Sequence, residues 1–361
     1  MVMGRIYLDR NENQYGPAPA CYKVLREANL EQLSLYSRAY ASGKKSDLSE
    51  RLSHDTGLPE KQILLSYGSE DMLKQVVHCY LHRDETILLP HQSWWYYKSV
   101  AKEVFGRETH YSMHEHNGRF EYDVQEMIDQ YDRHHPQVIL IASPNNPTGN
   151  SFSLDKLHSL VEHCTSSVIV LDEAYYGFSR SANEHLATLL DAHSRMVILR
   201  TFSKYFALAG LRIGYSCVGK DLAQLVEFSA RYLGYNLLSE KIALAALDDK
   251  EYYPRIAKLM EEDKEMYFNE FSRLQGFTPF PSEANFILVR YPKALKQGLK
   301  SGVERRDVIV KFLDDPGLED CIRITVGTKE QNAKVMDAFK QVACSELGVR
   351  TLEAAGVRAS A

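Results

Sequence analysis

The fold is constrained above all by short apolar runs that alternate with helical segments. Each run is rich in Val, Ile and Leu, and helix-like stretches such as 154–164 separate several of them. The runs occupy residues 85–90, 137–143, 167–173, 196–203 and 211–219, and a further strand, glycine turn and helix lie within 61–81. Strands of this kind between helices predict a mainly parallel α/β sheet that is covered by helices on both faces. Such sheets bind ligands beyond the carboxyl ends of their strands.

The length of the chain and a change of pattern near residue 250 predict two domains. At about 150 residues per domain, 361 residues suffice for two. Beyond residue 250 come a long charged helix at 252–274, strands within 284–290 and 321–327, and a final helix from Lys329. We therefore expect an N-terminal arm at 1–30, a large domain at 31–250 and a small α+β domain at 251–361. The arm is expected to join the small domain, and the last eleven residues to fray.

Charge and hydropathy exclude several classes of partner. Lys and Arg number 43 against 48 for Asp and Glu, so the net charge of −5 predicts no broad basic surface for nucleic acid or anionic membrane. No apolar run approaches the roughly 18 residues that a membrane span needs, and the first residues resemble no secretory signal. Any anion must therefore be bound by a few placed residues, and the expected partners are small molecules.

Cysteine and histidine spacing predicts no metal site. The six cysteines are scattered singly without a CxxC pair, which is typical of packing residues in a reduced cytoplasm. His78 and His82 are four residues apart in a helical segment, but no Glu follows His78 as in HExxH. We interpret them as residues of an ordinary helix face.

Polar side chains follow several of the predicted strands. The segment 143–149 closes one strand, Asp172–Tyr175 the next and Thr201–Lys204 the third, and Arg212 lies eight positions beyond Lys204. Each alone could be a surface loop residue. Taken together, residues at the exits of adjacent parallel strands are expected to converge on one site.

The order of these residues resembles the pyridoxal-phosphate site of the fold-type I aminotransferases. The residues that carry the resemblance are Asn146, Asp172, Tyr175, Lys204 and Arg212, with 201–215 similar to the Schiff-base segment. Segments 11–17, 281–290 and 321–328 narrow it to enzymes similar to histidinol-phosphate aminotransferase. The resemblance extends over nearly the whole chain and implies a mainly parallel, seven-stranded-type large sheet and the cofactor pyridoxal 5′-phosphate.

The resemblance assigns a chemical role to each strand-end residue. Lys204 is implied to form the Schiff base and to carry the proton between the substrate α-carbon and the cofactor. Asp172 is implied to keep the ring nitrogen protonated, because a nearby carboxylate favours a cation. Asn146 and Tyr175 carry donors that suit the phenolate oxygen of the ring.

The cofactor phosphate needs a cradle where a strand turns into a helix at Gly68. Backbone N–H groups at a helix N-terminus bind phosphate well. The candidate residues are Ser69 and Glu70 at that turn, the hydroxyls of Thr201 and Ser203, and the guanidinium of Arg212. The acidic side chains of Glu70 and Asp71 suit this role only if they point away from the phosphate.

Two aromatic residues complete the implied cofactor site. By its position after Pro90, Trp95 matches the residue that stacks on the ring. Tyr36 matches a tyrosine that reaches the phosphate of the neighbouring subunit, which implies a homodimer with shared active sites. For both residues a plain packing role is the alternative.

Substrate recognition is the part of the resemblance in which this chain departs from the pattern. Arg323 matches the arginine that binds the acidic end of the substrate, and Tyr15 and Asn13 match residues near it. Gln14 stands where proline is usual in these enzymes, and Arg10 stands where a small residue is common. Lys311 stands where arginine is typical, and Leu238 occupies a position that asparagine often holds. Arg and Lys are not interchangeable at bidentate phosphate sites. The four departures therefore affect the expectation that histidinol phosphate is the substrate more than the expectation of transamination.

The leading hypothesis is a cytoplasmic aminotransferase that moves an amino group between L-glutamate/2-oxoglutarate and histidinol phosphate, or an aromatic or phosphorylated amino compound. The alternative is a pyridoxal-phosphate decarboxylase of a phosphorylated amino acid of the phosphothreonine or phosphoserine type. A nicotinamide-dependent dehydrogenase is disfavoured, because the sequence contains no GxGxxG motif between a strand and a helix. In a non-catalytic binding module, Lys204 would have no role.

Overall fold

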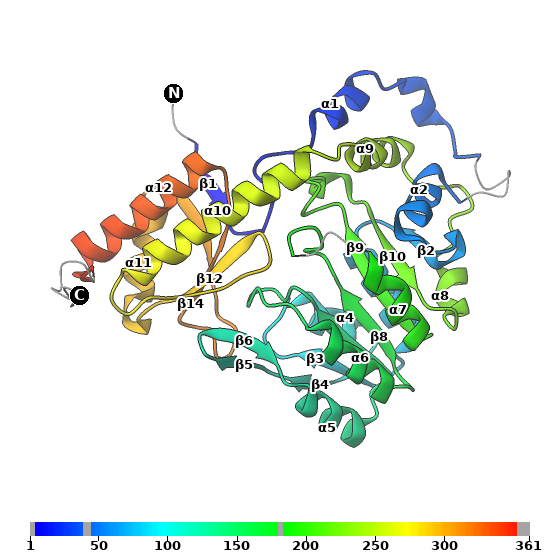
Figure 1. Ribbon diagram of the computed structural model, residues 1–361, viewed down its shortest axis with the longest axis horizontal. Coiled ribbons are helices and arrows are strands. Elements are labelled where there is room, and N and C mark those ends of the chain that lie inside the picture. The colour runs from blue at the N-terminus through cyan, green and yellow to red at the C-terminus, as the bar shows by residue number, and fades with distance from the viewer. Residues whose placement is uncertain (1–3, 39–44, 180–182, 352–361) are drawn as a thin grey trace.

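A computed structural model describes residues 4–38, 45–179 and 183–351 of the chain. These residues form two sheets and one separate hairpin, with most helices packed around the larger sheet (Figure 1). Among the described residues no helix is both long enough and apolar enough to cross a membrane. The architecture is the expected α/β fold.

The larger sheet has seven strands in the order β2-β10-β9-β8-β7-β3-β4. They are β2 (Ile63–Ser66), β3 (Thr86–Pro90), β4 (Arg107–Tyr111), β7 (Val138–Ala142), β8 (Val168–Asp172), β9 (Met196–Thr201) and β10 (Gly214–Val218). β10 runs antiparallel to both of its neighbours, and the other pairs are parallel. The first residue of β10 therefore lies at the same edge as the carboxyl ends of the remaining strands.

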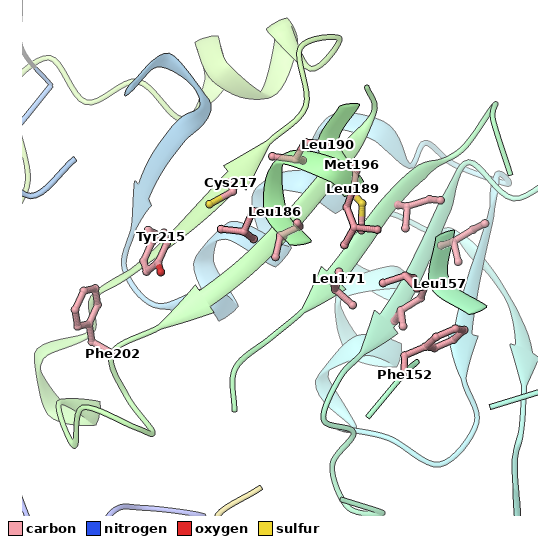
Figure 2. Packing of buried hydrophobic residues seen from close by; sticks show 14 of the residues in the cluster. Phe152, Leu157, Leu171, Leu186, Leu189, Leu190, Met196, Phe202, Tyr215 and Cys217 are labelled. Carbon is pink, nitrogen blue, oxygen red and sulfur yellow. The ribbon is translucent and has the colours of Figure 1, made fainter. Parts of the chain in front are cut away.

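Helices cover both faces of this sheet, because successive residues of its strands place apolar side chains on opposite faces. Val138 and Leu140 of β7 face a core that includes α3, α4 and α8, whereas Ile139 and Ile141 face the core of α2, α5, α6, α7 and α9. Figure 2 shows leucines of α7 packed over the strands in the second core. The helices are α1 (Pro19–Arg26), α2 (Asp47–Thr56), α3 (Ser69–Tyr80), α4 (Tyr96–Glu103), α5 (Val124–His134), α6 (Leu154–His163), α7 (Glu184–Ala192), α8 (Ala223–Phe228) and α9 (Leu237–Asp248).

The smaller sheet has the order β1-β13-β14-β12-β11 and carries its own apolar core. Its strands are β1 (Ile6–Leu8), β11 (Thr278–Phe280), β12 (Phe286–Arg290), β13 (Val308–Phe312) and β14 (Cys321–Thr325), and its helices are α10 (Tyr252–Ser272), α11 (Lys296–Glu304) and α12 (Lys329–Lys340). The N-terminal strand β1 pairs in parallel with β13. The arm is thus attached to the smaller sheet.

The hairpin of β5 (Met113–His116) and β6 (Arg119–Tyr122) extends from the larger sheet toward the smaller one (Figure 1). Arg290 of β12 forms an ion pair with Glu115 at 2.6 Å, and the rings of Phe120 and Phe280 lie 4.8 Å apart. The hairpin therefore connects the two sheets.

Several short strands were not expected from the sequence. They are β1, β4, β5, β6, β11 and β13. β4 is a polar edge strand, and β5 buries only Met113, so neither has the apolar signature of a central strand. At the C-terminus, Thr351 forms an isolated bridge with Leu274, and the rest of the segment expected to fray lies outside the described residues.

Candidate active site

Lys204 lies just beyond β9, at the edge where the strand ends converge. Its Nζ donates a hydrogen bond of 3.0 Å to the carbonyl oxygen of Arg10 in the N-terminal arm. Burial, followed by the positive charge of Arg323, lowers the pKa of Lys204 to about 8. The amine therefore becomes neutral far more readily than an exposed lysine does.

Asp172, the last residue of β8, has both carboxylate oxygens occupied. Tyr97 Oη donates to its Oδ2 at 2.8 Å, and the backbone N–H of Ala174 donates to its Oδ1 at 2.9 Å. Burial raises the pKa of Asp172, while these two hydrogen bonds lower it. The bonds thus favour the ionised form that a ring-nitrogen partner needs.

Tyr97 was not singled out from the sequence. It lies on α4, and its own burial together with that of Val100 and Ala101 at helical spacing places it on the inner face. That apolar periodicity predicts a core tyrosine. Its contact with Asp172 depends on the packing of α4 against the sheet.

Tyr175 is buried close to Asp172, and its hydroxyl accepts a hydrogen bond of 2.7 Å from Asn11 Nδ2. Its ring meets that of Phe286 edge to face, with centroids 5.3 Å apart. Burial raises the pKa of Tyr175, and the charge of Arg323 opposes this. Asn11 belongs to the arm motif at 11–17, although its contact with Tyr175 was not foreseen.

The turn before α3 packs tightly against Arg212. Gly68 has a φ of 86°, and a Cβ there would lie 2.8 Å from Arg212 Nη2, so the turn depends on glycine. The guanidinium thereby lies beside the turn that begins the helix, where Ser69 is the first residue. A helix N-terminus beside an arginine is a site suited to phosphate.

The remaining candidates are two hydroxyls at the end of β9, beside Gly214, and two acidic side chains in the first turn of α3. Thr201 Oγ1 donates to Ser203 Oγ at 2.9 Å. Asp71 turns back and accepts from the Tyr67 backbone N–H at 3.0 Å, as expected of a side chain that points away. Glu70 does not point away: its carboxylate lies 3.6 Å from Arg212 Nη2, because opposite charges on neighbouring exposed side chains attract.

Arg323 of β14 is buried, with only 9% of its surface exposed. It donates from Nη1 to Asn146 Oδ1 and from Nη2 to the carbonyl oxygen of Asp9 at 2.5 Å. Its Nε is buried without a hydrogen-bond partner among the described residues. Lys311 of β13 is opposite Arg323 in the antiparallel register, so both side chains lie on the same face of the sheet.

The arm residues expected near the substrate brace the arm itself. Asn13 Nδ2 donates to the carbonyl oxygen of Tyr205 at 3.1 Å, and Asn13 Oδ1 accepts from the Tyr15 backbone at 3.2 Å. Tyr15 packs against the apolar cluster that includes Met260. Gln14 accepts a bond of 3.4 Å from Gln331.

The two tryptophans differ in their contacts. Trp95 is 67% exposed and packs against Trp94 and Tyr96, at centroid distances of 6.4 and 5.7 Å. Trp94 is partly buried, and its ring lies 5.7 Å from that of Tyr97, which binds Asp172. Contacts within this chain thus connect Trp94, rather than Trp95, to Asp172 at the end of β8, through Tyr97.

Tyr36 is 71% exposed and lies in the segment after the short helix Leu30–Ser34. Leu30, Leu33 and Leu35 around it are also exposed. Of the remaining departures, Leu238 packs against the core below α9, and the Arg10 side chain is exposed, 3.8 Å from Asp9.

The residues of the site fit pyridoxal phosphate. The Gly68 turn and Arg212 form an anion cradle, Lys204 is a partly buried amine with a lowered pKa, and Asp172 is a buried carboxylate held by two donors. Together with the seven-stranded sheet, this arrangement defines a fold-type I pyridoxal-phosphate enzyme. The sequence model of the family "Aminotransferase class I and II" matches residues 5–339, and the chain belongs to that family.

The relatives of this chain include histidinol-phosphate aminotransferases. The enzyme of Ruminiclostridium cellulolyticum is 32% identical over 335 residues, which cover 92% of this chain and 91% of the relative. That of Bacillus subtilis (strain 168) is 29% identical over 340 residues, covering 93% and 91%.

Solved structures share the fold. Histidinol-phosphate aminotransferase from Sinorhizobium meliloti, in complex with pyridoxal-5′-phosphate, has a TM-score of 0.84 at 20% identity, covering 95% of this chain and 92% of that one. L-threonine-O-3-phosphate decarboxylase from Porphyromonas gingivalis has a TM-score of 0.77 at 21% identity, covering 93% and 98%. At these identities the likeness concerns the fold alone.

Proposed function

We propose that this aminotransferase exchanges an amino group between L-glutamate/2-oxoglutarate and an amino compound with an anionic end, with L-histidinol phosphate as the first candidate. The observation that carries the substrate proposal is Arg323 of β14, a buried arginine whose Nε has no partner among the described residues and which bonds Asn146, which follows β7 of the larger sheet. Its two Nη groups donate to neutral acceptors, so in the described part of the chain the buried charge and the free Nε–H still lack an anion, and an anionic substrate group supplies one.

The chain's own residues supply binding and proton transfer. Pyridoxal phosphate, the cofactor of this enzyme, is an electron sink for the substrate α-carbon. Lys204, as a base with a lowered pKa, is suited to move the α-proton. Asp172 would bind the ring nitrogen, and Tyr175 and Asn146 the phenolic oxygen. The Gly68 turn would bind the phosphate through the backbone N–H groups of Ser69 and Glu70, together with Thr201, Ser203 and Arg212, with the phosphate replacing the Glu70 carboxylate beside Arg212.

A ring-stacking residue is expected from the tryptophan pair. Trp95 is the residue assigned by its position in the sequence. Trp94 is a second candidate because it contacts Tyr97, which is bonded to Asp172.

A second cation supports an anionic substrate. Lys311 is opposite Arg323 and exposed, so it could meet a group that extends from a substrate bound at Arg323. Lys binds an anion as a point charge and not bidentately, so Lys311 is compatible with either a carboxylate or a phosphate. Tyr15 and Asn13 would border this subsite.

We further propose a homodimer with shared active sites. The exposed cluster of Leu30, Leu33, Leu35 and Tyr36 supports it, because contiguous apolar surface marks interaction sites. The cysteines of the described chain are unpaired, which is consistent with a reduced cytoplasm. The expected attachment of the arm to the small domain is supported by the pairing of β1 with β13, whereas α1 packs against α9 in the core of the larger sheet.

A half-reaction panel tests the proposed function. Purified holoenzyme is mixed separately with histidinol phosphate, phenylalanine, tyrosine, phosphoserine and glutamate, and the loss of its yellow absorbance is followed. We expect glutamate and histidinol phosphate to convert it, and 2-oxoglutarate to restore it. A Lys204→Ala protein that still performs both half-reactions would contradict the proposal.

The same panel separates the decarboxylase alternative. The decarboxylase of known structure shares the fold, so release of carbon dioxide is measured alongside. Carbon dioxide formed from a phosphorylated amino acid without any need for 2-oxoglutarate would favour that alternative over transamination.

Arg323→Ala tests the substrate anion site. The loss of charge-assisted bonds should raise KM for the anionic donor by about a hundredfold while pyridoxal-phosphate affinity stays the same. Arg305→Ala, which removes only a surface pair with Glu346, is the matched control. Unchanged kinetics in Arg323→Ala would reject the role.

A further inference from the structure

Asn11 is a buried residue of the arm that lies between the smaller sheet and Tyr175. Only 1% of its surface is exposed, and its φ is 55°, in the left-handed region that few side chains adopt. Residues held in this conformation persist where surrounding contacts determine them, and they cluster at functional sites. The hydrogen bonds around Asn11 therefore hold its backbone in this conformation.

Thr325 of β14 determines the orientation of the Asn11 amide. The Asn11 backbone N–H donates to Thr325 Oγ1 at 2.9 Å, and Thr325 Oγ1 donates its single proton to Asn11 Oδ1 at 3.2 Å. The oxygen of the amide is thereby held toward Thr325. Its nitrogen must face the other way, where it lies 2.7 Å from Tyr175 Oη.

An amide N–H can only donate, so the Tyr175 hydroxyl must accept this bond. The hydroxyl has one proton of its own, and that proton stays free for a different acceptor. We propose that Asn11 is a positioning residue that keeps the Tyr175 proton directed to the cofactor. This inference rests on the proposed function, in which that acceptor is the phenolic oxygen of pyridoxal phosphate.

The arrangement also couples the smaller sheet to Tyr175. Thr325 belongs to β14, and Asn285, which immediately precedes β12, donates to the carbonyl oxygen of Asn11 at 3.0 Å. Both anchors of Asn11 are therefore residues of the smaller sheet region. A displacement of that sheet would move the donor that orients Tyr175.

Other groups also act on Tyr175 and must be kept constant in a test. Arg323 favours its ionised form and Asp172 disfavours it, whereas Asn11 is neutral and acts through its hydrogen bond. Both variants at position 11 leave these charged neighbours in place, and Asn11→Gly adds no charge of its own, so it isolates the hydrogen bond, whereas Asn11→Asp adds a carboxylate.

The test compares two variants of the holoenzyme. Asn11→Asp preserves the shape and tolerates the left-handed φ, but its carboxylate accepts and so competes for the Tyr175 proton. Asn11→Gly removes the donor and relieves the backbone. A hydrogen bond donated by Tyr175 Oη withdraws electron density from the phenolic oxygen of pyridoxal phosphate, so this oxygen holds a neighbouring proton less tightly. Its loss should raise the midpoint pH of the holoenzyme's visible absorbance change, more in Asn11→Asp, and weaken pyridoxal-phosphate binding by about tenfold.

A double-mutant cycle separates positioning from a merely structural role. In the Tyr175→Phe background, Asn11→Gly should not move the midpoint further, because the effect passes through the Tyr175 hydroxyl. Asn332→Ala, which removes buried bonds to Tyr267 and Asp263 but none to Asn11 or Tyr175, should lower Tm and leave the midpoint unchanged.

The outcomes distinguish this inference from the proposed function. Wild-type protein that forms no yellow holoenzyme would overturn both. Normal half-reactions in the wild type, together with an unmoved midpoint in Asn11→Asp, or with equal shifts with and without the Tyr175 hydroxyl, would overturn the role of Asn11 alone.

Discussion

Burial changes the protonation of the reactive side chains in opposite directions. It lowers the pKa of Lys204 to about 8, lowers that of Arg323 and raises that of Asp172, because each change favours the neutral form. Hydrogen bonds from Tyr97 and Ala174 partly restore the charge of Asp172. The site thus pairs an amine that neutralises easily with a carboxylate that donors help to keep ionised.

The lowered pKa of Lys204 predicts how cofactor uptake depends on pH. Only the neutral amine attacks a carbonyl, so uptake of pyridoxal phosphate by the apoenzyme should accelerate with a midpoint near pH 8. The rate is followed by the appearance of the yellow colour, with Lys204→Ala as the colourless control. A midpoint near the ordinary lysine value of 10.5 would contradict the burial of this amine.

Tyr97→Phe removes one donor from Asp172 and preserves the ring. A hydrogen bond to a charged group contributes about 1.5–3 kcal/mol, so kcat/KM should fall by about ten- to a hundredfold. The matched control is Tyr96→Phe, since Tyr96 is adjacent on α4 and only partly buried. If both variants were equally active, the bond to Asp172 would have no catalytic consequence.

At the scale of elements, the site depends on the close approach of β10 to the turn after β2. β10 begins at Gly214, which pairs with Thr201 on one side and Ser66 on the other. A Cβ at Gly214 would lie 2.8 Å from the Arg200 carbonyl oxygen and 2.9 Å from the Gly68 carbonyl carbon. The absence of a side chain therefore lets the cradle turn meet the strand ends.

Gly214→Ala should separate these elements. Inserting a methyl group into such a contact typically costs about 1–3 kcal/mol, so we expect a lower Tm and weaker pyridoxal-phosphate binding, measured by thermal unfolding and by titration. Gly210→Ala, where a Cβ would meet nothing within 4 Å, is the control. Equal behaviour of the two variants would show that the approach of β10 is not limiting.

At the scale of the whole molecule, consecutive arm residues meet the reactive side chains. The carbonyl oxygens of Asp9 and Arg10 accept from Arg323 and Lys204, and the amide of Asn11 donates to Tyr175. The arm is in turn paired with the smaller sheet through β1. The site is thus assembled from parts of the chain that are far apart in sequence.

The proposed shared site predicts complementation between subunits. If Tyr36 serves the partner's site, mixing Lys204→Ala and Tyr36→Phe proteins should yield hybrid dimers in which one site carries neither change. Activity should reappear on mixing, and sedimentation should give twice the chain mass of 41.3 kDa. No regain of activity, with Tyr36→Phe strongly impaired alone, would count against a shared site.

The sequence by itself determined the α/β class and the strand-end residues. Apolar periodicity is a local property, so β3, β7, β8 and β9, and the helix α6 between β7 and β8, could be predicted from their own residues. Parallel strands expose their carboxyl ends at one edge, which is why Asp172 and Lys204 could be expected together.

Only the tertiary structure decided which further side chains meet that cluster. The contacts of Tyr97 with Asp172 and of Asn11 with Tyr175 join residues 75 and 164 positions apart. The pairing of Lys311 with Arg323 depends on strand register, and β4 lacks the apolar signature of a central strand. Such contacts follow from how distant elements pack, and no local pattern of residues encodes them.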